Sequence, residues 1–166
     1  MKVAIAVPVL AALLMLQMAI FSQTLLLQGA PDLVLVALLA WAIQKPVSTA
    51  WQWTVIGGLL VSYVSALPFG VYLAGYAAAV GLALLLKQRV WQLPILALLI
   101  AAFFGSMLSN LAALAALRIT GAAIPFWQAL NLVTLPSMLW NIGLAIPFYV
   151  IFAELAAVLH PEELEV

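Results

Sequence analysis

The 166-residue chain is 69% hydrophobic and only 6% charged, with a mean hydropathy of +1.30. A soluble domain of this length carries roughly 25% charged residues because its surface must face water, so this composition excludes one. The formal net charge is zero, which gives no sign of nucleic acid or acidic partners, and the absence of cysteine excludes disulfides, thiolate catalysis and cysteine-ligated metals.

The apolar runs predict an all-α, polytopic membrane bundle of about six transmembrane helices, forming a single transmembrane domain over residues 1–166. The first run, Val3–Phe21, follows Met1-Lys2 and resembles a signal peptide in its charged start. A signal peptide has an apolar core of only about 7–15 residues and then an Ala-x-Ala-like cleavage site. This run is longer and no such site follows it, so a retained helix is favoured.

The second run starts at Pro31-Asp32 and continues to Ile43. Proline suits the first helical turn, and a carboxylate there complements the helix dipole. At 1.5 Å per residue this run reaches only about 20 Å, so it is short unless it includes Leu25–Leu27. Lys45-Pro46 ends it.

Three further runs occupy the middle of the chain and end at prolines or basic residues. They are Trp51–Leu67, closed by Pro68; Phe69–Leu86, closed by Lys87-Gln88-Arg89; and Trp91–Leu117, ending at Arg118. The last run, Leu130–Leu159, is long and contains Pro136 and Pro147, so we expect a kink or a broken start.

The basic residues predict the orientation. With six spans and a cytoplasmic N-terminus, only Arg118 lies outside, which agrees with the positive-inside rule and leaves both termini in the cytoplasm. The four basic residues on the inner side are Lys2, Lys45, Lys87 and Arg89. Tryptophans near the span ends are expected at the two interfaces: Trp41, Trp51, Trp53, Trp91 and Trp127.

The sequence offers little catalytic chemistry. The single histidine, His160, follows the last span, while Asp32 and Glu154 belong to opposite sides of the bilayer and cannot form a carboxylate pair. Metal ligands do not converge, and no Gly-rich phosphate loop occurs, so we expect neither an enzyme nor a bound cofactor. Glu154 is either a functional intramembrane carboxylate or, as we favour, a side chain that reaches water or pairs with Lys87 or Arg89.

Small and polar residues inside the runs predict helix packing. Gln17, Asn110 and Asn141 either line a substrate pocket or join helices by hydrogen bonds, and the second interpretation is favoured. Small residues recur at every fourth position of the fifth run, and a shorter series occurs in the fourth. Such ridges let a second helix backbone approach closely, within the bundle or in a partner. The long ridge is Ala97, Ala101, Gly105, Ser109 and Ala113, and the short one is Gly75, Ala79 and Ala83.

Three stretches together resemble the MreD family, the small membrane subunit of the bacterial rod-shape machinery. The resemblance extends over most of the chain. One position departs from the family, which often has an aspartate where this chain has Ser62. The stretches are Pro31-Asp32-Leu33; Gly58-Leu59-Leu60 with Pro68-x-Gly70 and Leu73-Ala74-Gly75-Tyr76; and Pro136-x-x-x-x-Asn141 with Pro147-Phe148-Tyr149.

The resemblance implies a non-enzymatic scaffold in the bacterial inner membrane. Such a subunit binds MreC and supports lateral peptidoglycan synthesis by coupling MreB filaments indirectly to RodA and its transpeptidase partner. MreD bundles are also similar in fold to the S-components of vitamin transporters, so a substrate-binding transport component is the alternative. S-components commonly have an Ala-x-x-x-Ala ridge on the first helix, whereas the long ridge here is on the fifth, which favours the scaffold.

Overall fold

The computed structural model describes residues 3–21, 29–90, 92–121 and 125–159, and every regular element among them is helical. The all-helical fold class is therefore confirmed. The helices are α1 (Ala6–Phe21), α2 (Leu33–Ile43), α3 (Ala50–Val64), α4 (Val71–Arg89), α5 (Pro94–Ile119), the short α6 (Phe126–Gln128), the π-helical η1 (Ala129–Thr134) and α7 (Leu135–Leu159).

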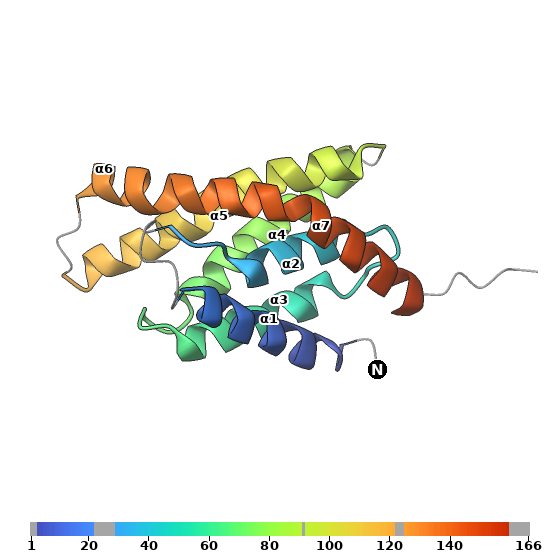
Figure 1. The fold of residues 1–166 in the computed structure, drawn as a ribbon, viewed down its shortest axis with the longest axis horizontal. Coiled ribbons are helices and arrows are strands. Elements are labelled where there is room, and N and C mark those ends of the chain that lie inside the picture. The colour runs from blue at the N-terminus through green and yellow to red at the C-terminus, as the bar shows by residue number, and fades with distance from the viewer. Residues whose placement is uncertain (1–2, 22–28, 91, 122–124, 160–166) are drawn as a thin grey trace, which may run out of the picture.

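The bundle is built around α2. Figure 1 shows the long helices running back and forth, so the start of α1 and the end of α7 lie at the same end of the bundle. Helices α1, α3, α4, α5 and α7 all contact α2, and each of its eleven residues is buried. A helix that is apolar on every side is stable only when other elements surround it.

Three helical segments are long and apolar enough to cross a membrane: Val71–Arg89, Pro94–Ile119 and Phe126–Leu159. Ala6–Ala19 and Leu33–Ile43 are apolar but shorter. Of the about six expected transmembrane helices, three therefore have the length and composition of a full span, and the second is short, as its sequence predicted. Helix α2 rises only about 16 Å, against about 30 Å of bilayer hydrocarbon, because Asp32 caps its start and Lys45-Pro46 follows its end. The chain is nevertheless membrane-embedded in character.

Polar groups complete both ends of the buried α2. At its N-terminus the Asp32 side chain accepts a hydrogen bond from the Leu35 N–H. Beyond its C-terminus the Lys87 ammonium donates to the carbonyls of Gln44 and Val47, at 2.6 and 3.2 Å. A carboxylate at the first turn and a cation at the last turn both complement the helix dipole. The two charges therefore stabilise a helix that no water can solvate.

The last segment begins irregularly, as its prolines predicted. The π-helical η1 ends just before Pro136, whose missing N–H removes a hydrogen bond in the first turns of α7. Pro147 lies inside α7 and removes a second one. Figure 1 shows α7 bending along its length.

Two tryptophans are located differently from the interfacial positions expected for them. Trp41 and Trp53 are fully buried, and their rings stack with centroids 4.4 Å apart. Phe152 of α7 meets both edge-on. Trp51 and Trp127 are exposed, while Trp91 lies outside the described residues. The rings of Trp41 and Trp53 therefore fill the core between α2, α3 and α7.

Candidate functional site

Asp32 is the centre of a hydrogen-bonded network in the interior. The Tyr76 hydroxyl of α4 donates to its carboxylate and lies 2.8 Å from each of the two oxygens. Oδ1 also accepts from the Leu35 N–H at 3.0 Å. The backbone N–H of Asp32 donates to Asn141 Oδ1 of α7 at 2.8 Å. One residue at the start of α2 thus connects that helix to α4 and α7.

The network extends to two more helices through amide side chains. Asn141 Nδ2 donates to the Ser106 hydroxyl of α5 at 2.8 Å. Gln17 of α1 accepts from the Val34 N–H at 3.3 Å. Because the first N–H groups of a helix have no partner within it, the side chains of Gln17, Asp32 and Asn141 satisfy donors that burial would otherwise leave unpaired.

A cavity of about 170 Å³ adjoins this network. Five elements contribute polar side chains to its wall: Gln17 of α1, Asp32, Tyr72 of α4, Ser109 and Asn110 of α5, and Ser137 and Asn141 of α7. Asn110 was expected to join helices, but in the described residues its Nδ2 donates to the Ser106 carbonyl of its own helix. Its side chain forms part of the cavity wall.

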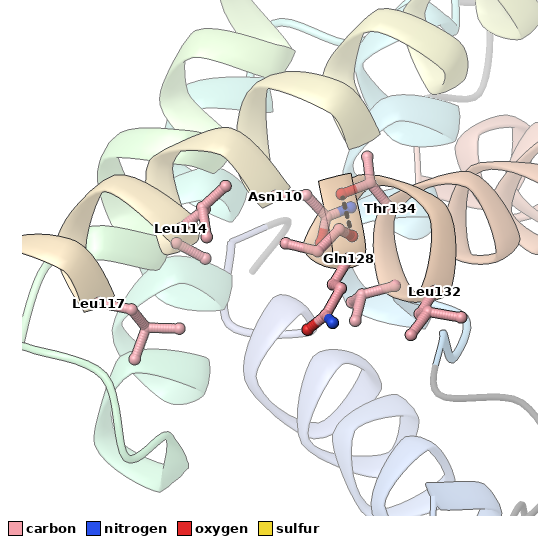
Figure 2. Close-up of a pocket in the computed structure, with 9 residues that line it drawn as sticks. Asn110, Leu114, Leu117, Gln128, Leu132 and Thr134 are labelled. Carbon is pink, nitrogen blue, oxygen red and sulfur yellow. Dashed lines mark hydrogen bonds between the residues drawn. The ribbon is translucent and has the colours of Figure 1, made fainter. Parts of the chain in front are cut away.

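A second hollow of about 290 Å³ lies beside the first, between α5 and the segment α6–η1. The two hollows share Asn110, Ala113 and Val133 in their walls. Figure 2 shows the second hollow, with Asn110 and Thr134 among the residues of its wall. Leu114, Leu117 and Leu132 supply apolar surface, so this hollow is less polar than the cavity at Asp32.

The small-residue ridge on α5 faces the short ridge on α4. Ala97, Ala101, Gly105 and Ser109 are buried, and Ala113 is half-buried. A Cβ atom added at Gly105 would lie 3.0 Å from the Ala79 Cβ, and one at Gly75 would lie 3.1 Å from the Ser109 Cα. The two helix backbones therefore approach closely within the bundle.

The residues that carry the MreD resemblance fall into two groups. Pro31, Asp32, Gly75 and Asn141 lie in or near the polar network, since Gly75 packs on Ser109 and precedes Tyr76. The others shape helix junctions. A Cβ at Gly58 would lie 2.8 Å from the Leu73 Cα, so α3 and α4 approach closely there. Pro68 and Gly70 form the turn between α3 and α4, with Gly70 at φ +91°. Pro136 lies in the first turn of α7, where it packs against Gly29.

Two other positions of interest lie away from this network. The hydroxyl of Ser62, at the position often acidic in the family, is buried and has no hydrogen-bond partner within the described part of the chain. Glu154 is exposed on α7 and lines a separate apolar groove between α1 and α7. Lys87 donates to backbone carbonyls and not to Glu154. His160 lies outside the described residues.

The sequence analysis did not single out Ser106, and it named Tyr76 only as the last residue of a stretch that resembles MreD, with no role of its own; these are the two hydroxyl partners in the network. Their signal was faint, because a tyrosine or serine in an apolar helix is common and neither occurs in a spacing typical of a site. No group of three or more potential metal ligands occurs among the described residues. Comparison of the chain with protein-family models, curated proteins and solved structures finds no match.

Proposed function

We propose that this protein is a non-enzymatic scaffold subunit of the bacterial cell-shape complex, resident in the inner membrane with both termini cytoplasmic. It binds an MreC-like protein and, through it, supports lateral peptidoglycan synthesis with the RodA–transpeptidase pair and MreB. One observation carries the proposal. Asp32, Tyr76 and Asn141 come from the three separate stretches that resemble MreD. Tyr76 and Asn141 both form hydrogen bonds with Asp32.

The way the polar groups are used also supports a scaffold. The Asn141 amide and the Asp32 carboxylate bond mainly to other parts of the bundle and tie α2, α4, α5 and α7 together. In lipid, interhelical hydrogen bonds and close packing are the main forces that hold helices in place. A bundle fastened in this way presents a fixed outer surface, which a subunit that positions several partners requires.

Partner recovery from native membranes tests the scaffold proposal. The tagged full chain, solubilised in mild detergent, is expected to bring down an MreC-like protein identified by mass spectrometry. Depletion of the chain in a rod-shaped host is expected to produce rounded cells. Rod-shaped growth after depletion, together with recovery of no cell-shape protein, would contradict the proposal.

A second function is favoured by the cavity at Asp32. A substrate-binding component of a small-molecule transporter needs a pocket with a few convergent polar groups, and side chains from five elements converge here. In that case the same pull-down is expected to recover an energy-coupling ATPase and its membrane partner. The identity of the recovered proteins therefore separates the two functions.

A further inference from the structure

The negative charge of Asp32 has only neutral partners. Its carboxylate accepts from the Tyr76 hydroxyl and the Leu35 N–H, and these are its hydrogen-bond donors among the described residues. The dipole at the start of α2 adds partial compensation. An ionisable group inside a membrane bundle is costly unless a counter-charge is near, and such groups mark ligand or ion sites.

The surroundings of Asp32 leave room for a counter-charge. Asp32 forms part of the wall of the 170 Å³ cavity, and among the residues that the structure describes no lysine or arginine lines that cavity or the adjoining hollow. The other polar groups in the wall are hydroxyls and amides, such as Tyr72, Ser109 and Asn110, which can accept hydrogen bonds. The cavity thus offers one carboxyl group and several other acceptors, which suits a donor with a positive charge.

The adjoining hollow determines the shape of the ligand. It continues from Asn110 and Ala113 towards Leu117 and Leu132, where the wall is mainly apolar apart from the exposed Gln128 (Figure 2). A molecule that enters both hollows therefore has a polar end at Asp32 and an apolar part between α5 and η1.

We propose that this pair of hollows binds an organic cation, with a primary ammonium group held by Asp32 and an apolar body beside Leu114 and Leu117. In a low-dielectric interior the attraction between ammonium and carboxylate is much stronger than in water. The ammonium can belong to a free amine or to the headgroup of phosphatidylethanolamine. If the protein is a transport component, this site defines its substrate class as organic cations. If the protein is a scaffold, the bound cation is an effector of it.

Three probes with one carbon skeleton test the charge requirement. The purified full chain in detergent is dialysed to equilibrium against 2-phenylethylamine, 2-phenylethanol or phenylacetate. The amine is expected to bind at least about tenfold more tightly than the alcohol or the acid, which corresponds to about 1.4 kcal/mol. Equal binding of amine and alcohol overturns the proposal.

Matched variants locate the site. Asp32→Asn keeps a side-chain cap for α2 and an acceptor for Tyr76 but removes the charge, so amine affinity should fall at least about tenfold. Glu154→Gln removes a carboxylate elsewhere on the bundle and should leave affinity unchanged. Ala113→Leu should fill the space where the two hollows meet, and so weaken amine binding although Asp32 is unchanged. Unchanged affinity in Asp32→Asn or in Ala113→Leu overturns the proposal, and the second variant decides if the first does not fold.

Lipid composition separates the two sources of the ammonium group. Amine affinity is measured in nanodiscs of phosphatidylglycerol with and without phosphatidylethanolamine. A several-fold fall with phosphatidylethanolamine identifies the headgroup as the occupant, and equal affinities identify a free amine. Failure of amine binding leaves the scaffold proposal standing, because recovery of an MreC-like partner tests that proposal separately.

Discussion

Asn141 joins three helices with one amide. Its oxygen accepts from the Asp32 N–H of the segment that starts α2, and its Nδ2 donates to the Ser106 hydroxyl of α5. The bond to Ser106 is buried, and the bond to Asp32 is partly buried beside the cavity. The amide therefore holds the start of α2 in position against two of the long helices.

Replacing Asn141 by leucine removes both bonds and leaves the Asp32 N–H without a partner. We expect a loss of about 1–3 kcal/mol in stability, because an unpaired buried donor keeps its full desolvation cost. Thermal unfolding of the purified protein in detergent measures the effect. The control Asn131→Leu changes an exposed amide of η1 and should unfold at the wild-type temperature. Equal midpoints for the two variants would show that the network does not contribute to stability.

The sequence predicted some residue roles and missed others for a geometric reason. The capping position of Asp32 followed from local order, because an acidic residue before an apolar run complements the helix that follows. Its partners Tyr76 and Asn141 are 44 and 109 positions away, and a single sequence has no signal for such distant pairs. Likewise, the amide type of Asn110 did not reveal that it bonds its own helix.

At the scale of elements, the α4–α5 interface depends on the absence of side chains. Gly105 faces both Ala79 of α4 and Leu39 of α2, since a Cβ there would lie 3.0 Å and 3.4 Å from atoms of these residues. Close backbone approach gives the dispersion contacts that drive helix association in lipid. The interface is therefore sensitive to any larger side chain at this position.

Gly105→Leu is expected to lower the thermal stability of the isolated protein by several degrees, because α4 or α2 must move to admit the side chain. Gly143→Leu provides a matched control, since nothing lies within 4 Å of a Cβ at that position of α7. Circular dichroism melts in detergent compare the two. A stable Gly105→Leu protein that fails to recover a partner would instead indicate a docking surface for another chain.

Lys87 completes the C-terminal end of α2 from a neighbouring helix. Lys87→Met keeps the length of the side chain but removes the donor to the Gln44 and Val47 carbonyls, so we expect reduced stability by about 1–2 kcal/mol. Arg89→Met, two residues further along α4 and exposed, is the control and should have little effect. Denaturant titration in mixed micelles measures both. Equal stability of the two variants would show that Lys87 does not stabilise the C-terminal end of α2.

The sequence predicted where helices occur more reliably than which surface each one buries. Apolar runs closed by Pro68, Lys87 and Arg118 located α3, α4 and α5 to within a few residues. Trp41 and Trp53 were expected at the interfaces because their runs end nearby, yet they stack in the core. Every face of these helices is apolar, so periodicity cannot distinguish a lipid-facing side from a protein-facing one.

For the whole molecule, the distribution of basic residues predicts which end faces the cytoplasm. Single cysteines at Gln88 and Thr120 lie at the exposed ends of α4 and α5. In intact cells a membrane-impermeant thiol reagent should label the cysteine at Thr120 and not the one at Gln88. Permeabilised cells, in which both should react, provide the control. Labelling at Gln88 alone would reverse the orientation.

If the proposed orientation holds, the two charges at the ends of α2 make the fold responsive to membrane voltage. In the proposed orientation the negative Asp32 lies towards the outside and the positive Lys87 towards the cytoplasm, separated by the roughly 16 Å rise of α2. A resting potential that is negative inside favours this direction for both charges. The pair spans about half of the hydrocarbon thickness, so the voltage contributes about 1 kcal/mol per 100 mV. In that proposed orientation an energised membrane favours this placement of the two charges, and a protonophore that collapses the potential is expected to remove that contribution.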